Sequence, residues 1–152
     1  MIFLPGRSFI SRRAMSRWVI QSFSAQARAN YPGADDFKMP NTPKWTVNVG
    51  GTGTLFDDDS KGRAQVRVDY SYRSAMFKEF SNDPTLYQKA VGLLSASLTY
   101  RTPDERIEAT LGVTNITDEA YIVSGVSNGG IGYAQAVVSR PREWFVSLKY
   151  EY

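Results

Sequence analysis

The strongest constraint on this chain is an alternation of apolar and polar residues with a period of two, clearest in its final segment, Arg142 to Tyr152. Every second position of that segment is apolar or aromatic: Trp144, Val146, Leu148, Tyr150 and Tyr152. The positions between them are mostly polar, with Phe145 as the exception. A period of two predicts a β-strand with two chemically different faces. One strand cannot cover its own apolar face, so this segment must belong to a larger sheet.

Four earlier segments show the same alternation and predict further strands. They run from Trp45 to Leu55 or Phe56, from Arg63 to about Phe77, from Val91 to Arg101, and onward from Arg106. The connections between the strands alternate between short ones, 57–62 and 102–105, and long ones, 78–90 and about 117–141. The sequence therefore predicts an all-β fold, an antiparallel meander of about five long amphipathic strands.

The composition supports strands and excludes several kinds of active site. The chain contains 9 Tyr and 8 Phe against 4 Met, and aromatic side chains favour the pleated surface of a sheet. It contains neither Cys nor His, which excludes disulfides, thiolate metal sites, the usual zinc ligands and the Ser-His-Asp and Cys-His catalytic groups. The run Asp57-Asp58-Asp59 does not fit a calcium loop, because two of the liganding positions would be Lys61 and Val68. We expect no enzyme, no cofactor and no metal.

The N-terminal segment, residues 1–37, differs from the rest of the chain. The first 34 residues hold five Arg and no acidic residue, whereas the remaining 118 hold 13 basic and 15 acidic residues. The net charge of +3 therefore comes from this segment, and a folded nucleic-acid-binding face is not indicated. Its apolar runs are too short for a secretory signal, although its composition also resembles an organelle transit peptide. We expect residues 1–37 to be a basic, flexible, poorly structured arm and residues 38–152 to form the sheet.

Strand length separates two possible architectures. Strands of a transmembrane barrel need about 9–11 residues at their tilt, whereas strands in soluble proteins are commonest at about 5–6 residues. The predicted strands have roughly 10–14 residues, with aromatic residues near their ends on the apolar face, as in the interfacial girdles of barrels. If Tyr152 lies at the periplasmic end, both short turns are periplasmic and the long connections are extracellular. These patterns favour a transmembrane β-barrel segment, with a soluble all-β ligand-binding domain as the alternative.

Four segments carry motifs in a fixed order: NTPKWTVNVGG (Asn41 to Gly51), VDYSYRS (Val68 to Ser74), the stretch from Leu93 to Ile122, and PREWFVSLKYEY (Pro141 to Tyr152). The most specific part is NITDEAY, from Asn115 to Tyr121, which is followed some 20 residues later by Pro141-Arg142 and an aromatic terminus. In order and spacing, residues 38–152 resemble the C-terminal β-barrel portion of the TonB-dependent outer-membrane receptors. The resemblance marks these signature residues: Asn115, Thr117, Asp118, Glu119, Tyr121, Pro141 and Arg142.

The resemblance implies an outer-membrane receptor of a Gram-negative bacterium for energy-coupled uptake of a scarce nutrient, such as a siderophore, a vitamin or a glycan. Such receptors have a barrel of about 22 strands that an N-terminal globular plug fills. Five strands cannot enclose a wide lumen, and an open edge in hydrocarbon leaves backbone groups unpaired at a cost of several kcal/mol each. We therefore expect a C-terminal fragment that lacks the plug and most of the barrel and is not transport-competent alone.

The expected partners follow from the same resemblance. They are outer-membrane lipid, the outer-membrane assembly machinery, and the remainder of the barrel and plug in a full-length receptor. TonB would be reached only through the missing N-terminal part, and no nucleic acid is expected.

Two sets of residues receive roles in the predicted barrel. The apolar positions of the last strand resemble the signal that the assembly machinery reads by strand addition; these are Trp144, Val146, Leu148, Tyr150 and Tyr152. On the opposite, polar face, charges of both signs are expected to line the lumen and to form ion pairs there, with a possible role in substrate contact; these are Arg67, Asp69, Arg73, Arg101 and Glu108.

Overall fold

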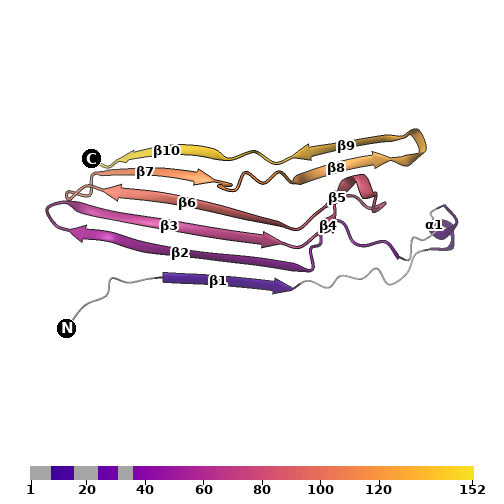
Figure 1. Cartoon of the computed structure of the whole chain (residues 1–152), viewed down its shortest axis with the longest axis horizontal. Coiled ribbons are helices and arrows are strands. Elements are labelled where there is room, and N and C mark those ends of the chain that lie inside the picture. Colours follow the sequence, from indigo (N-terminus) through magenta and orange to yellow (C-terminus); the bar gives the residue numbers. More distant parts are fainter. Residues whose placement is uncertain (1–7, 16–23, 31–35) are drawn as a thin grey trace.

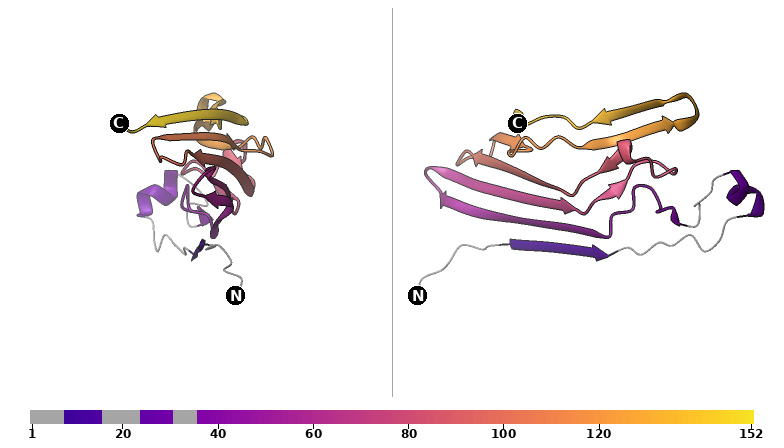
Figure 2. Two further views of the ribbon diagram at one scale, coloured as in Figure 1. Left: turned by 90° about the vertical axis from the view of Figure 1, so that its left-hand side faces the viewer. Right: turned by 45° about the vertical axis from the view of Figure 1, so that its right-hand side comes forward.

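The computed structural model of the chain describes residues 8–15, 24–30 and 36–152. Six strands form one sheet in the order β1-β2-β3-β6-β7-β10, and every pairing is antiparallel. They are β1 (Ser8–Met15), β2 (Trp45–Asp58), β3 (Gly62–Arg73), β6 (Val91–Arg101), β7 (Ile107–Thr114) and β10 (Glu143–Tyr150). The order of the strands in the sheet follows their order in the chain, and Figures 1 and 2 show them as a single layer. The predicted antiparallel meander is confirmed.

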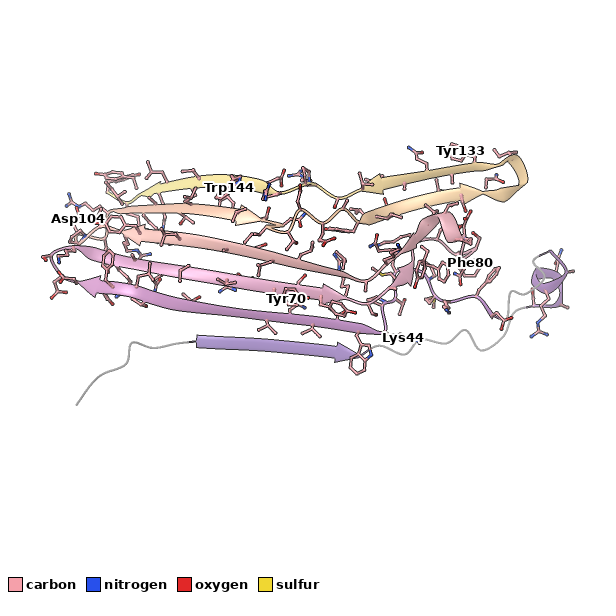
Figure 3. The ribbon with its side chains drawn as sticks, viewed as in Figure 1. Lys44, Tyr70, Phe80, Asp104, Tyr133 and Trp144 are labelled. Carbon is pink, nitrogen blue, oxygen red and sulfur yellow. The ribbon has the colours of Figure 1, made fainter. Side chains whose placement is uncertain are left out.

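The long connections contain smaller elements, which lie together at one end of the molecule (Figure 1). Between β3 and β6 stand β4 (Met76–Phe77), the 3-10 turn η2 (Pro84–Leu86) and β5 (Tyr87–Gln88); between β7 and β10 stand β8 (Ile122–Asn128), η3 (Gly129–Ile131) and β9 (Tyr133–Val138). The short helix α1 (Ala25–Asn30) precedes β2. Figure 3 places Phe80 and Tyr133 at this end and Asp104 at the opposite end, beside the C-terminus. No helix among the described residues is long and apolar enough to cross a membrane.

Three strands differ from the sequence-based expectation. β2 continues to Asp58, two residues beyond the expected end at Phe56. β1 lies in the segment expected to be an arm, and it pairs with β2 from Met15 opposite Trp45 to Ser8 opposite Thr52. Its sequence, SFISRRAM, has no period-two alternation. The hydrogen bonds that make it a strand therefore come from a neighbour remote in sequence. The strand expected to reach Phe77 ends at Arg73, because the following residues form β4 and pair with β5.

The register gives the sheet two chemically distinct faces. Tyr70 pairs with Val49 and Leu94 on one face, whereas its neighbour Asp69 pairs with Gly50 and Ser95 on the other. We call these the apolar face and the polar face. The apolar face is uncovered, since Leu98 is 44%, Leu111 48% and Val146 77% exposed. Figure 2 shows no second layer of described residues against it, whereas a soluble β-domain must cover such a face.

The short turns are held by local hydrogen bonds. In the turn after β2, Asp58 Oδ1 accepts hydrogen bonds from the backbone N–H groups of Ser60, at 2.8 Å, and Lys61, at 3.1 Å. Gly62 follows with a φ of +81°, and a Cβ there would collide with the backbone of Arg101. Asp57 and Asp58 thus belong to the end of β2, and residues 59–61 form the exposed turn that returns the chain to β3.

Most of the buried side chains of the described residues lie at the loop end, and Ala64 of β3, which is 5% exposed, is the exception on the sheet. Leu86 is 1% exposed, while Met76 and Val91 are each 6% exposed. Gln88 and Lys78 are also buried there, at 6% and 7% exposure. The long connections therefore pack as an ordered cluster, and the sheet below them keeps both faces open.

Candidate functional site

The polar face of the sheet carries all five charged residues that were expected to line a lumen. Asp69 stands opposite Gly50 and Ser95, Arg67 opposite Thr52 and Ser97, and Arg101 opposite Glu108. Two of the charges pair within one strand, because the Arg67 guanidinium donates to both carboxylate oxygens of Asp69 at 2.7 and 2.6 Å. Arg101 donates to Glu108 Oε2 across the β6–β7 pair at 3.2 and 2.5 Å.

The ion pair at the short-turn end is part of a larger group of charges. Lys149 stands opposite Glu108 in the β7–β10 register, and it also forms an ion pair with Glu151. Arg101, Glu108, Lys149 and Glu151 all line one shallow depression. Charges of alternating sign therefore run across the end of three adjacent strands.

Arg73, the fifth charged residue, lies at the loop end of the polar face. Its guanidinium carbon is 5.5 Å from the centre of the Tyr121 ring, which is the geometry of a cation–π contact. Lys78 is close by. Burial lowers the pKa of the Lys78 ammonium, and the positive charge of Arg73 lowers it further.

The signature residues meet at the base of the β8–β9 hairpin. Asn115 and Asp118 have φ angles of 50° and 56°, a left-handed conformation that Asn and Asp tolerate best after Gly. The Asp118 N–H donates to the Asn115 carbonyl at 2.9 Å and closes a tight turn directly after β7. Local chemistry thus explains why the strand stops at Thr114.

The Asn115 side chain joins the two ends of this connection. Its Oδ1 accepts from the Glu119 N–H at 3.0 Å, while its Nδ2 donates to the Glu119 carbonyl at 3.0 Å and to the Arg140 carbonyl at 3.4 Å. Asp118 Oδ1 accepts from the Arg142 N–H at 2.7 Å. The side chain of Asn115 is buried, and both of its polar atoms are satisfied. We call this set of contacts the base clamp.

The other signature residues have different surroundings. The Arg142 guanidinium donates to the Ile116 carbonyl at 3.4 Å, and the Tyr121 N–H donates to Ser139 Oγ at 3.2 Å. Glu119 contributes to the base clamp through its backbone. The Thr117 side chain makes no hydrogen bond to the other described residues, and nothing in the structure explains its place in the motif.

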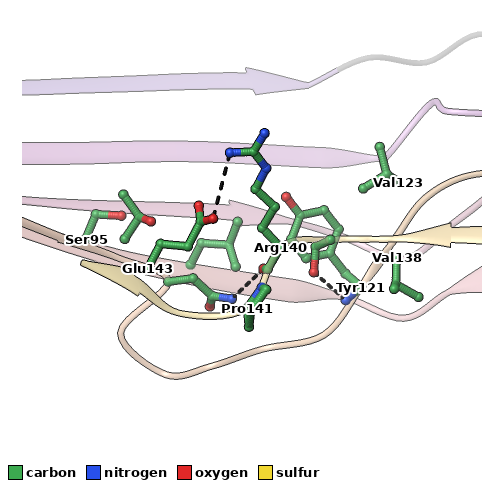
Figure 4. A pocket seen from close by; sticks show the side chains of 11 residues that line it. Ser95, Tyr121, Val123, Val138, Arg140, Pro141 and Glu143 are labelled. Atoms are coloured by element: carbon green, nitrogen blue, oxygen red, sulfur yellow. Dashed lines mark hydrogen bonds and ion pairs between the residues drawn. The ribbon is translucent and has the colours of Figure 1, made fainter. Parts of the chain in front are cut away.

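A cavity of about 410 Å³ opens beside the base clamp (Figure 4). Leu93 and Ser95 of β6 line it together with Tyr121, Arg140 and Glu143. The Arg140 guanidinium lies 3.8 Å from the Glu143 carboxylate. A second hollow of about 320 Å³ shares Leu93 and Ser95 with the first and extends to Arg67 and Asp69. The polar face is therefore hollowed along a line from β2 to the start of β10.

This hollow offers hydrogen-bond donors, acceptors and charges of both signs. Among residues 8–15, 24–30 and 36–152 no cluster of three or more carboxylates is placed to hold a metal. The sequence alone did not single out Arg140, Ser139 or Gln88. Their hydrogen-bond partners Asn115, Tyr121 and Ile122 lie 25, 18 and 34 positions away, and no local pattern predicts contacts over such separations.

The residues expected to form an assembly signal lie on the last strand, at the edge of the sheet. Trp144, Val146, Leu148 and Tyr150 pair with Val113, Leu111, Ala109 and Ile107 of β7. Their side chains are exposed, from 60% for Tyr150 to 77% for Val146, and Tyr152 follows the strand. Among the described strands β10 pairs only with β7, so the backbone groups along its other edge have no strand partner in the described sheet.

The chain matches one family model and one solved structure. Residues 11–116 match the β-barrel of TonB-dependent-receptor-like proteins, and this range begins inside β1. The fold is similar to the ferric yersiniabactin uptake receptor FyuA from Yersinia pestis, with a TM-score of 0.63 and 21% identity over 74% of this chain. The matched part is 17% of that receptor, so the chain spans a small fraction of its length. No curated protein matches significantly. The family match covers more than half of the residues, and the chain belongs to the TonB-dependent receptor β-barrel family.

Proposed function

We propose that this chain is the C-terminal wall segment of an outer-membrane receptor that takes up a scarce nutrient in a Gram-negative bacterium. The observation that carries the proposal is the division of a long antiparallel sheet into an exposed apolar face and a hollowed, ion-paired polar face. In a transmembrane barrel the first face meets lipid and the second faces the lumen. Arg67, Asp69, Arg73, Arg101 and Glu108 are then lumen residues, as the sequence predicts.

The nutrient is proposed to be a siderophore, a vitamin or a glycan. FyuA is named as an uptake receptor for ferric yersiniabactin, which makes an iron chelate the first candidate to test. The cavity beside Arg140 and Tyr121 opens on the polar face, where a solute in the lumen would pass. Uptake would be energy-coupled through TonB, which reaches such receptors by way of a plug.

The six strands are not expected to transport alone, because so few strands cannot enclose a wide lumen. The chain would act together with further strands and a plug in a complete receptor. The edge strand β10, with Tyr150 near its end, is proposed to be the segment that the outer-membrane assembly machinery binds. In this proposal the partners are that machinery, outer-membrane lipid and the rest of the receptor.

The face assignment can be tested with single cysteines, because the chain has no Cys of its own. A fluorophore is attached at Val68 or Leu111 on the apolar face, or at Ser97 or Thr110 on the polar face. The full chain is then reconstituted in vesicles that contain a spin-labelled lipid. We expect strong quenching at the first two positions and weak quenching at the others.

Equal quenching on both faces contradicts the proposal. A chain that is monomeric in water and melts cooperatively without detergent favours the alternative, a soluble all-β ligand-binding domain.

A further inference from the structure

The best-buried side chain of the described residues links two connections that are far apart in the sequence. Leu86, in η2, is 1% exposed, and its methyl groups lie against Gly125 in β8. A Cβ at Gly125 would stand 2.5 Å from Leu86 Cδ2 and 3.0 Å from the Gln135 carbonyl oxygen. The absence of a side chain at position 125 is therefore what allows Leu86 to enter. The two residues form an interlock.

Two hydrogen bonds join the same two connections on either side of this interlock. The buried Gln88 side chain accepts a hydrogen bond from the Ile122 N–H, at the start of β8. Ser127, near the end of β8, donates to Glu79 Oε2 at 3.0 Å. Since the contacts are spread along β8 from end to end, the hairpin cannot pivot on any one of them.

A third segment is attached to the first. Asn82 accepts from the Lys38 N–H at 2.5 Å and donates to the Lys38 carbonyl at 2.8 Å. The Asn41 N–H donates to the Phe77 carbonyl at 2.8 Å. Residues 36–44, 74–90 and 115–142 are thus tied together, and we call them the loop block.

The loop block also forms one wall of the cavity on the polar face. Tyr121, Val123 and Val138 line the cavity and lie at the base of the hairpin whose β8 strand holds Gly125. The base clamp fixes where this hairpin leaves the sheet, and none of its hydrogen bonds involves η2. The angle of the hairpin above its base is therefore set by Leu86, Gln88 and Glu79.

We propose that the long connections of this chain behave as one mechanical unit, in which Leu86 and Gly125 are positioning residues for the wall of the cavity. A solute that enters the cavity then displaces the whole loop block and not one hairpin. This consequence rests on the proposed function, whereas the coupling within the block does not.

The coupling is tested by amide hydrogen exchange, measured by mass spectrometry on the full chain in detergent micelles without ligand. In Leu86→Ala we expect exchange to rise at least about tenfold in residues 74–90 and, by a similar factor, around Tyr121 and Ser139. Leu86→Met, which keeps the volume, should exchange like the wild type. Leu98→Ala is the matched control, because Leu98 lies on the apolar face, and it should leave both regions unchanged.

A rise confined to residues 74–90, with residues 121–139 protected as in the wild type, overturns the proposal. If Leu86→Ala does not refold, the milder Gly125→Ala is measured by the same amide exchange. Here too, a rise confined to one of the two regions overturns the proposal.

A double-mutant cycle gives a second test of the contact between Leu86 and Gly125. Gly125→Val crowds Leu86, so Gly125→Val combined with Leu86→Ala should exchange less than the sum of the single effects predicts. Strict additivity contradicts a direct interlock. Because no ligand is needed, a failure here is separate from a failure of the proposed transport role.

Discussion

The ring of Phe145 lies over Gly112, its direct partner in the β7–β10 pairing, and occupies the place of the missing side chain. Phe145 is the one aromatic residue of β10 at a polar position, and Gly112 is the glycine at the matching position of β7. A Cβ at Gly112 would overlap the ring. Phe145 thus departs from the apolar–polar alternation of β10 because its ring fills the space beside Gly112 on the neighbouring strand.

Replacing Gly112 by Val should therefore weaken the attachment of β10. We expect a loss of about 1–3 kcal/mol, the usual cost of overpacking, in urea unfolding of the chain in detergent. Adding Phe145→Ala should recover much of this loss, because it removes the ring that the new side chain meets. A double variant as unstable as the sum of its parts would falsify the contact.

Asn115→Ala should open the base clamp. The substitution removes the hydrogen bonds to Glu119 and Arg140 and places a Cβ-bearing residue without a polar side chain at a φ of 50°. We expect a loss of about 2–3 kcal/mol, from the hydrogen bonds and from the left-handed backbone. Asn115→Gly tolerates that φ, so it separates the two causes and should cost less than Ala. Equal stability of all three proteins contradicts the clamp.

Neighbouring positions of β10 should respond oppositely to a charge if the apolar face meets lipid. Val146→Arg puts a cation on the apolar face, whereas Ser147→Arg puts it on the polar face beside Thr110. In lipid vesicles we expect Val146→Arg to cost about 2–4 kcal/mol, the penalty near the bilayer midplane, and Ser147→Arg to cost little. The comparison is made by urea titration of tryptophan fluorescence. Similar losses in the two variants count against a lipid-facing wall.

The turn after β6 should make stability depend on pH. The Thr102 hydroxyl donates to Asp104 Oδ1 at 2.6 Å, and this bond, followed by the Arg106 N–H, lowers the pKa of the Asp104 carboxyl. Since the pKa is lowered in the folded state, the stabilisation is present above the ordinary value of about 3.9 and is lost as the pH falls through the folded value.

The measurement is a carboxyl carbon NMR titration of the folded chain. Thr102→Val should raise the pKa of Asp104 towards its ordinary value, while Thr102→Ser, which keeps the hydroxyl, should leave it low. An Asp104 pKa that Thr102→Val does not change would show that the hydroxyl is not the cause.

The sequence alone predicted five of the six strands of the sheet, because their alternation is local and the pleat of a strand converts it directly into two faces. The same alternation predicted which face carries Arg67 and Glu108. It also predicted that the short and long connections lie at opposite ends.

Contacts between remote residues could not be predicted in this way. β1 has no alternation of its own and is a strand because β2 supplies its hydrogen bonds. The long connections contain hairpins, but only packing shows that Leu86 enters the space above Gly125.

The difference between the features that the sequence predicts and those that it does not has one physical reason throughout this protein. Whether a residue lies on the apolar face, on the polar face or in a turn depends on its near neighbours in the sequence, and a period of two is enough to specify it. The motif from Asn115 to Tyr121 can be read from the sequence. Its hydrogen bonds to Arg140 and Arg142 cannot, because they form only when the chain folds back some 25 residues later. The sequence therefore determined the strands of the sheet and their two faces, and the tertiary structure decided which contacts hold the loop block together.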